Sequence, residues 1–236
     1  MISSPNFSPN LRSTIAYVPN GTNSPLSHLN PQVKTHASVK NSSKRAIDIL
    51  GALVGLVLTA AIAIPIAIAL HFTSPGPLFY RQIRCGLNGK TFRLWKFRSM
   101  VTDADRLKHL VKNQANGFIF KNKNDPRITR VGKFLRQTSL DEFPQFWNVL
   151  KGEMSLVGTR PPTPDEVEKY NDYHWQRLQV KPGLTGEWQV NGRSSVKDFE
   201  DIVKMDLDYQ EKWSIGYDLK LILQTFGAIL SKKGAY

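Results

Sequence analysis

An acidic pair stands in an otherwise basic part of the sequence. Asp141 and Glu142 lie in "QTSLDEFPQFWNVLKGEMSLVGTRP", residues 137–161. Carboxylates can hold Mg²⁺, which usually keeps several waters and bridges to substrate phosphates. Arginine gives bidentate hydrogen bonds to phosphate. Basic residues flank the pair on both sides: Arg127, Arg130, Lys133, Arg136, Lys151 and Arg160. These residue types favour phosphate chemistry and a basic binding module about equally.

The acidic pair also fits a purely structural interpretation. Ser139 and Glu142 have the S-x-x-E spacing of a capping box. Pro144 would then lie at the fifth helical position, where its missing N–H breaks a hydrogen bond. If Asp141 caps the helix instead, Pro144 falls in the first turn, where no donor is needed. We therefore expect a helix that begins near Asp141, at an end whose dipole attracts anions.

The composition limits the kinds of partner and of site. The chain has 236 residues, which suits one domain with an appendage. Its 32 Lys and Arg against 19 Asp and Glu give a formal charge of +13, which attracts nucleic acid, anionic lipid or nucleotide phosphates. Cys85 is the only cysteine, which excludes an intramolecular disulfide and a thiolate zinc cluster. The histidines show no metal-ligand spacing, so a zinc site is not expected.

Two segments precede the region of the acidic pair. Residues 1–43 are rich in Ser, Asn, Pro and Thr without hydrophobic periodicity, so we expect a disordered tail. Residues 44–73 include a stretch, 49–72, that has no Asp, Glu, Lys or Arg and is long enough to cross a bilayer. This stretch is apolar on all sides, whereas buried helices of soluble proteins usually keep a polar stripe. We therefore expect a membrane helix.

Pro65 and the flanking charges argue against a simple span. Pro65 lacks an N–H and pushes on the carbonyl of Ala61, so the helix should kink or break there. Both flanks are basic: Lys40, Lys44 and Arg45 precede the segment, and Arg81, Arg84, Lys90 and Arg93 follow it. Because Lys and Arg favour the cytoplasmic side, we expect a re-entrant, broken helix that enters and leaves by one face. An ordinary single span is the alternative.

The remaining residues, 74–236, are expected to form one domain that carries the acidic pair. Alternating runs at 78–84 and 91–97 around an Asn-Gly turn predict a β-hairpin. Helical patterns occur at 103–113, 196–213 and 217–233, and the last of these could pack on the core, lie on the bilayer or pair with a second chain. The expected fold class is α/β, mainly helical with a β-hairpin, and attached to the membrane by the re-entrant helix.

Two longer stretches carry a family resemblance. "DPRITRVGKFLRQTSLDEFPQFWNVLKGEMSLVGTRP" and "VKPGLTGEWQVNGR" resemble the bacterial sugar transferase family, the monotopic polyprenol-phosphate phosphoglycosyl transferases. The likeness extends from about Lys44 to the C-terminus. It implies transfer of a phosphosugar from a nucleotide diphosphosugar, commonly a UDP-sugar, to polyprenol (undecaprenyl) phosphate, with Mg²⁺. This reaction begins the synthesis of a bacterial polysaccharide or glycoconjugate at the cytoplasmic face of the inner membrane.

The resemblance also implies roles for particular residues. Asp141 is the expected nucleophile, which forms a covalent phosphosugar intermediate, and Glu142 is expected to help hold Mg²⁺ with Asp141 or to manage a proton. The residues expected to bind phosphate are Arg136, Arg160, Arg127 and Arg130. Possible nucleotide- or sugar-binding residues are Glu187, Gln189, Asn191 and Arg193. The membrane anchor is expected to depend on Arg45, Asp48 and Pro65. A plain turn is the alternative at Asn191.

The sequence departs from the family pattern at three positions. Ile64 precedes the proline where relatives often have Ser, Thr159 stands where many have Pro, and Glu187 replaces an apolar residue. The identity of the sugar therefore cannot be carried over.

The expected partners are a UDP-sugar, polyprenol phosphate and membrane lipid, without nucleic acid, and a homodimer is left open. Two other functions remain: a membrane-tethered module that binds nucleic acid or anionic lipid, and a metal-dependent phosphohydrolase.

Overall fold

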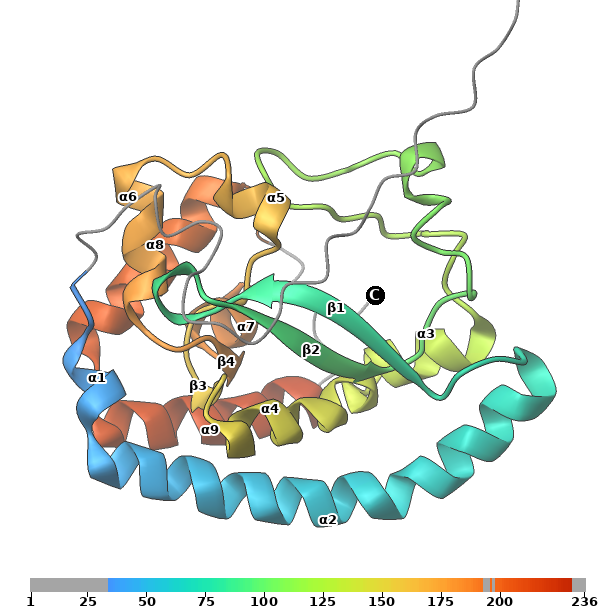
Figure 1. The fold of residues 1–236 in the computed structure, drawn as a ribbon, viewed down its shortest axis with the longest axis horizontal. Coiled ribbons are helices and arrows are strands. Elements are labelled where there is room, and N and C mark those ends of the chain that lie inside the picture. The colour runs from blue at the N-terminus through green and yellow to red at the C-terminus, as the bar shows by residue number, and fades with distance from the viewer. Residues whose placement is uncertain (1–33, 193–195, 197, 231–236) are drawn as a thin grey trace, which may run out of the picture.

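The computed structural model describes residues 34–192, 196 and 198–230. The helices are α1 (Ala37–Lys40), α2 (Ser42–Thr73), α3 (Arg130–Gln137), α4 (Phe146–Lys151), α5 (Pro164–Val167), α6 (Asp172–Trp175), α7 (Glu187–Asn191), α8 (Phe199–Lys212) and α9 (Ile215–Leu230). The strands are β1 (Phe79–Cys85), β2 (Thr91–Phe97), β3 (Ser155–Val157) and β4 (Gly183–Thr185). This is a mainly helical α/β fold, as expected (Figure 1). Residues 1–33 of the expected tail lie outside the described part, and α1 and the first turn of α2 begin before residue 44.

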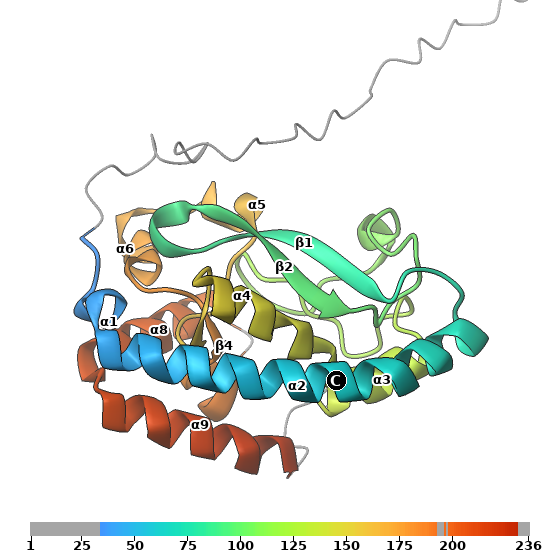
Figure 2. The same cartoon turned by 60° about the horizontal axis from the view of Figure 1, so that its bottom comes forward.

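The long helix α2 lies along one side of the body and has two different faces (Figures 1 and 2). Its buried positions recur every three, four or seven residues: Lys44, Asp48, Ala52, Gly55, Thr59, Ile66 and Leu70. The outer face exposes Leu50, Leu53, Val54, Val57, Leu58, Ile64, Ile68 and Phe72. Within the expected apolar stretch, 49–72, the inner face is a narrow stripe formed by small or apolar residues and Thr59, whereas the charged residues Lys44 and Asp48 of the same face precede it.

Small residues in this stripe let the helix approach the body closely. A Cβ added at Gly55 would lie 2.3 Å from the ring of Phe146, so only glycine fits there. By length and composition, α2 is the one helix in the described part that could cross a membrane. Only 22% of its most apolar 18-residue segment is buried inside the protein, so α2 is a candidate membrane-associated segment with a largely uncovered apolar surface.

The helix continues through Pro65. Residues Ser42–Thr73 form one helix, so the expected break is absent and the helix bends instead (Figure 1). Pro65 is exposed, which places it on the outer face. There the ring and the missing N–H open the outer side and favour a bend toward the body. Ile66 and Leu70 on the inner side pack against Phe97 and Leu135 and hold the second half of the helix in place.

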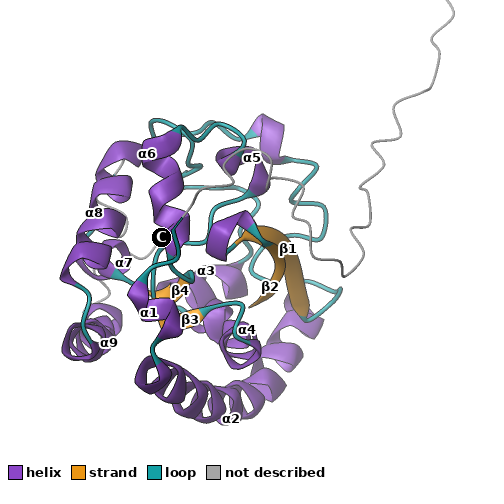
Figure 3. Ribbon diagram, turned by 60° about the vertical axis from the view of Figure 1, so that its left-hand side comes forward, coloured by secondary structure: helices purple, strands orange, loops and turns teal. Residues whose placement is uncertain are grey.

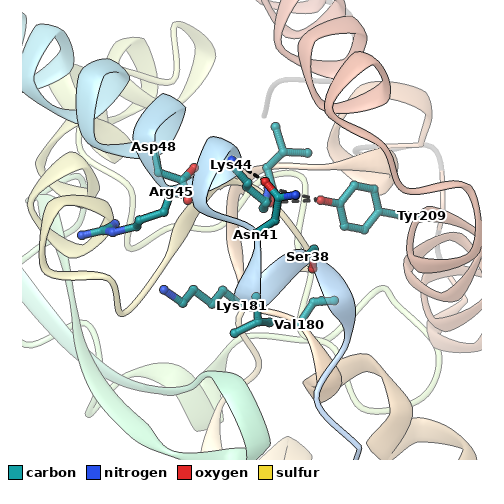
Figure 4. A pocket seen from close by; sticks show the side chains of 10 residues that line it. Ser38, Asn41, Lys44, Arg45, Asp48, Val180, Lys181 and Tyr209 are labelled. Carbon is teal, nitrogen blue, oxygen red and sulfur yellow. Dashed lines mark hydrogen bonds between the residues drawn. The ribbon is translucent and has the colours of Figure 1, made fainter.

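A buried network joins the start of α2 to the distant C-terminal helices. Figure 4 shows two of its members, Lys44 of α2 and Tyr209 of α8. Lys44 Nζ donates to Asp218 Oδ2 at 2.6 Å and to the carbonyl of Val157 at 3.0 Å. Tyr209 donates its hydroxyl to the other Asp218 oxygen at 2.8 Å. Lys44 is 7% and Asp218 3% exposed, so each charge is satisfied by a partner rather than by water.

Arg45 and Asp48, the expected anchor pair, bind different parts of the body. The Arg45 guanidinium donates to the carbonyls of Val149 at 2.8 Å and Leu150 at 2.6 Å, at the end of α4. Asp48 Oδ1 accepts from Ser155 Oγ at 2.9 Å and from the Leu156 N–H at 2.8 Å, on β3. The other end of α2 is tied as well, because Arg98 donates to Ser74 Oγ at 2.8 Å and also to the Ser74 carbonyl. Both ends of α2 are therefore attached to the same body.

The predicted hairpin is confirmed. β1 and β2 pair antiparallel from Phe79 opposite Phe97 to Cys85 opposite Thr91. The Asn-Gly turn forms a short 3₁₀ helix, Leu87–Gly89, in which Asn88 has a φ of 51°. Asn148, completely buried on α4, joins this hairpin to the rest of the fold: its amide donates to the Arg93 carbonyl at 2.7 Å and accepts from the Trp95 N–H at 3.2 Å.

Two other expectations differ from the structure. Residues 103–113 form turns and a 3₁₀ helix, Lys108–Leu110, instead of the expected helix. The two-stranded parallel pair β3–β4 was not predicted.

The predicted helices α8 and α9 are both present. Leu221 of α9 is fully buried beside Val157 and Tyr209, so one face of α9 packs on the core. Leu219, Leu223 and Phe226 of α9 are exposed. Figures 2 and 3 show α9 on the same side of the body as α2.

We predict that replacing Asp48 by alanine lowers the free energy of unfolding by about 2–4 kcal/mol, because it leaves the buried Ser155 hydroxyl and Leu156 N–H without an acceptor. Thermal unfolding of the purified protein in detergent measures the change. Asp48→Asn keeps an acceptor oxygen and should be the milder variant. Equal stability of the alanine variant and the wild type would contradict this role.

Candidate active site

The acidic pair lies on a 3₁₀ helix, Leu140–Gln145, that runs directly into α4. Ser139 precedes it with a φ of 58°, a left-handed conformation, and its side chain makes no capping hydrogen bond to the helix. The capping box, which was the structural alternative, is therefore absent. The helix begins at Leu140, close to the expected start, but Asp141 is its second residue and not its cap. The left-handed residue Ser139 connects the end of α3 to the 3₁₀ helix that carries the acidic pair.

Asp141 is buried among charged neighbours. Its side chain is 8% exposed, and Lys96 Nζ lies 4.0 Å from its Oδ2 atom. The same lysine donates to Glu142 Oε1 at 2.7 Å. Burial, assisted by the negative charge of Glu142, raises the pKa of Asp141 to about 6, while Lys96 and Arg136 act in the opposite direction. Asp141 is thus a carboxyl group poised close to neutral pH.

Asp141 and Glu142 line an open cleft of ≈ 680 Å³, a size typical of ligand sites. Nine basic side chains line it: Arg84, Lys96, Arg98, Lys108, Lys121, Arg127, Arg136, Arg160 and Lys169. Six acidic side chains also line it: Asp105, Asp125, Asp141, Glu142, Asp165 and Glu166. The excess of positive charge suits a ligand that carries phosphate groups.

The structure brings three of the four expected phosphate-binding arginines into this cleft. Arg136, at the end of α3, donates its Nε–H to Ser99 Oγ at 2.9 Å and contributes to the field at Asp141. Arg160 binds Glu166 with both terminal nitrogens, at 2.9 and 3.3 Å. That carboxylate also completes the capping box of α5. Arg160 is therefore held in a fixed orientation at the wall of the cleft.

Arg127 is in the cleft wall but has other partners. Its guanidinium binds Asp125 at 2.9 and 2.7 Å and donates to the carbonyl of Ala104 at 3.1 Å. These bonds occupy most of its donors, so Arg127 mainly fixes the loop around it. Arg130 is exposed at the first position of α3 and does not line the cleft.

Three of the four expected nucleotide or sugar residues, Glu187, Gln189 and Asn191, also lie outside the cleft lining. Glu187 accepts from Asn191 Nδ2 at 2.6 Å and from the hydroxyl of Tyr217 on α9, so it joins α7 to α9. Gln189 Oε1 is buried and has no hydrogen-bond partner in the part of the chain that the structure describes. Arg193 lies outside the described residues. Trp188, between Glu187 and Gln189, is the residue of α7 that does line the cleft.

The sequence of this chain is similar to those of known proteins. Residues 39–232 match the family model described as bacterial sugar transferase. The chain belongs to the bacterial sugar transferase family. It is 51% identical over 195 residues to "Galactosyl transferase CpsE" of Streptococcus agalactiae, and 44% identical over 202 residues to "Undecaprenyl-phosphate galactose phosphotransferase" of Salmonella typhimurium.

These alignments cover 82% of this chain but only 43% and 41% of those two relatives. The chain thus spans less than half the length of these relatives. "Exopolysaccharide production protein ExoY" of Rhizobium meliloti is more similar in length: 38% identity over 200 residues covers 82% of this chain and 88% of that protein.

The sequence analysis of this sugar transferase missed Lys96 and Arg84. Both are on the hairpin, where Tyr80, Gln82 and Arg84 share one face of β1 and Lys96 pairs with Tyr80. Arg84 donates to the Pro161 carbonyl at 2.9 Å, next to Arg160. Burial and the charge of Arg160 lower the pKa of Arg84 to about 10. Alternation along the strand was the signal that could have identified these two residues.

The donor atoms at the acidic pair fit Mg²⁺. No group of three or more His, Cys, Asp or Glu side chains arranged for a metal occurs in the described part of the chain. Mg²⁺ does not need such a group, because one or two carboxylates, several waters and substrate phosphates usually complete its shell. Asp141 and Glu142 are adjacent carboxylates that line a cationic cleft, which matches that donor set.

We predict that Asp141→Asn stabilises the protein at neutral and alkaline pH. Because folding raises the pKa of Asp141 from 3.8 to about 6, its ionisation costs on the order of 2–3 kcal/mol more in the folded than in the unfolded chain at pH 8 and about half of that at pH 5. Thermal unfolding at both pH values measures the gain. Asp201→Asn, at an exposed position on α8, is the control and should change stability by less than about 0.5 kcal/mol. A gain that is larger at pH 5 would contradict the assigned pKa shift.

Proposed function

We propose that this sugar transferase moves a phosphosugar from a UDP-sugar to undecaprenyl phosphate and so initiates the synthesis of a bacterial polysaccharide. The observation that carries this proposal is a buried carboxyl group, Asp141, in a cationic cleft that adjoins a long apolar helix. The names of two relatives support the substrate class, since they describe undecaprenyl-phosphate transferases of galactose or glucose phosphate.

The proposed reaction has two steps at one carboxylate. In the first, an oxygen of Asp141 attacks the phosphorus that bears the sugar, the bond from that phosphorus to the bridging oxygen breaks, and uridine monophosphate leaves. In the second, an oxygen of undecaprenyl phosphate attacks the same phosphorus and the bond to Asp141 breaks. The carboxylate is regenerated, and the product is a lipid diphosphosugar.

The cleft residues have separate roles in these steps. Lys96 fixes Glu142 and keeps a positive charge 4.0 Å from Asp141, which favours the ionised, nucleophilic form. The positive charge of Arg136 acts on the Asp141 carboxylate in the same direction. Arg160 and Arg84 lie farther along the wall, where they can bind the phosphate that departs with the nucleoside.

We also propose that Asp141 and Glu142 hold Mg²⁺. When bound, the ion would offset negative charge on the diphosphate. A cation at this position would also favour ionised Asp141, which burial alone disfavours.

The attachment of α2 supports a geometry in which both of its ends stay on one membrane face. Lys44 and Asp48 bind the start of the helix to the body, and Ser74 at its end binds Arg98 of the same body. A helix with both ends attached to one body cannot place those ends on opposite sides of a bilayer. We therefore propose that α2 lies within the cytoplasmic leaflet, re-entrant in the sense of entering and leaving by one face, as a bent helix rather than a broken one.

This placement also gives the lipid substrate a route to the carboxylate. Phe97 lines the cleft and packs against Ile66 and Leu70 of α2. Pro77 and Phe79 line the same end of the cleft. An acceptor whose chain lies in the bilayer can thus present its phosphate at this end.

We predict that incubation with a UDP-sugar and Mg²⁺, without lipid, produces a protein adduct with the mass of one phosphosugar. Asp141→Asn should abolish the adduct, and the Asp201→Asn control should retain it. Because Asp141 must be ionised, the rate of adduct formation should fall as the pH is lowered. Burial raises the pKa of Asp141 to about 6 in the metal-free protein, and bound Mg²⁺ should move the midpoint of this fall below that value. Intact-protein mass spectrometry measures adduct and rate together.

Two results would replace the proposed reaction. Steady release of uridine monophosphate without any lipid would indicate a phosphohydrolase. No release of nucleotide and no effect of Asp141→Asn would indicate a binding module.

We predict that single cysteines placed before and after the anchor in the sequence are protected on the same side of the membrane. Lys40→Cys and Lys90→Cys place exposed thiols before α2 and in the hairpin turn, and the native Cys85 is buried. In intact cells neither should react with a membrane-impermeant maleimide, and both should react after lysis. Labelling at position 40 alone in intact cells would indicate a single span and overturn the proposed topology.

A further inference from the structure

The cleft extends beyond the acidic pair to an end that no role above uses. Phe118, Phe120, Lys121 and Trp188 line this part, which we call the distal end. It borders the largest apolar cluster of the fold, to which Phe118 and Trp188 contribute. The opposite end, at Pro77 and Phe97, adjoins α2. The distal end is therefore on the side of the cleft away from the apolar helix.

Each aromatic ring of the distal end is paired with a basic side chain of the same cleft. Lys121 Nζ lies 5.1 Å from the ring centroid of Trp188. The Arg127 guanidinium lies 5.3 Å from Phe120, and Lys169 Nζ lies 6.0 Å from Phe118. Flat rings next to fixed cations suit a ligand that combines a planar base with phosphate. In addition, the buried Nε1–H of Trp188 has no hydrogen-bond partner among the described residues, which is costly unless a ligand group completes it.

Basic residues connect the acidic pair to the distal end. Arg84 is close enough to Glu142 and to Arg160 for both charges to influence its pKa. Arg160 in turn is close enough to Lys121 to help burial lower the pKa of that lysine to about 8. Lys121 is held in place by the Val196 carbonyl at 2.6 Å. A row of basic residues, Arg84, Arg160 and Lys121, thus leads from the acidic pair to the distal end.

We propose that the distal end, formed by Phe118, Phe120, Lys121 and Trp188, binds the nucleoside of the UDP-sugar. This assignment rests on the proposed function. The sugar-bearing phosphorus then lies at Asp141, the second phosphate lies between Arg84 and Arg160, and the base contacts the aromatic rings. The polar nucleoside occupies the end away from the membrane, and the sugar remains near the acidic pair.

Binding of uridine monophosphate and of glucose 1-phosphate to the purified protein in detergent tests the assignment. Both probes carry one phosphate, but only the first carries a base. Isothermal titration calorimetry should show that Trp188→Leu and Lys121→Met each weaken uridine monophosphate about ten-fold or more. The affinity for glucose 1-phosphate should change less than about three-fold, since that probe binds near Asp141. Trp147→Leu, at an exposed tryptophan outside the cleft, is the matched control and should leave both affinities unchanged.

Other outcomes would overturn the assignment. Unchanged affinity for uridine monophosphate in both cleft variants would place the nucleoside elsewhere, and selective weakening of glucose 1-phosphate would make the distal end a sugar site. If Trp188→Leu does not fold, Lys121→Met and Phe120→Leu decide the question by the same comparison.

The transfer assay distinguishes failure of this assignment from failure of the proposed function. A wild-type protein that transfers sugar phosphate, together with a Trp188→Leu variant whose KM for the UDP-sugar is unaltered, refutes only the distal site. A wild-type protein that transfers nothing, together with the expected loss of uridine monophosphate binding, refutes the reaction and supports the site.

Discussion

The structure depends on how one very apolar helix is attached to a basic, polar domain. α2 solves this with a narrow inner stripe in which charged residues occupy the first turns and small residues the middle: Lys44, Asp48, Ala52, Gly55 and Thr59. Each charge is matched by a group far away in sequence, Asp218 for Lys44 and β3 for Asp48. Because Thr59 also donates to the carbonyl of Phe143 at 3.2 Å, the same stripe contacts the 3₁₀ helix that carries Asp141. The position of the Asp141 carboxylate relative to the apolar surface of α2 is therefore fixed by the packing of the helix.

The charges around Asp141 reflect a balance between stability and reactivity. Burial favours the neutral acid, whereas Lys96 and Arg136 favour the carboxylate, and the result is a pKa of about 6. A fully exposed aspartate would be ionised but strongly hydrated. A buried aspartate without cations would be a neutral acid and a poor nucleophile. Cations nearby but not in direct contact with the carboxylate leave its oxygens available, and this is the arrangement that the proposed nucleophilic role of Asp141 requires.

The sequence predicted the elements whose signals are local. Alternation and an Asn-Gly turn identified the hairpin, and apolar spacing identified α8 and α9. Predictions failed where tertiary contacts decide. Asp141 lies inside a 3₁₀ helix that follows a left-handed turn at Ser139, instead of capping a helix. α2 bends without breaking at Pro65, because Ile66 and Leu70 are held by the body. In the site, Asp141, Glu142, Arg136 and Arg160 were found because they share one motif. Lys96 and Arg84 come from the hairpin, outside both motifs, and Trp188 comes from the second motif. Arg130 and Glu187 are also motif residues, but they lie outside the cleft lining.

The two ends of the cleft offer a reason for a covalent mechanism. The end at Phe97 adjoins α2, whereas the distal end at Trp188 is on the side away from it. A nucleotide sugar arrives from water and a polyprenol phosphate arrives from the bilayer, so the two proposed substrates meet the protein at opposite ends. With Asp141 between them, the phosphosugar can remain on the protein while the nucleotide leaves from the end at which it entered. The lipid phosphate then needs to reach only the carboxylate. One short displacement at each step thus replaces a direct transfer in which both large substrates would have to be aligned at the same time.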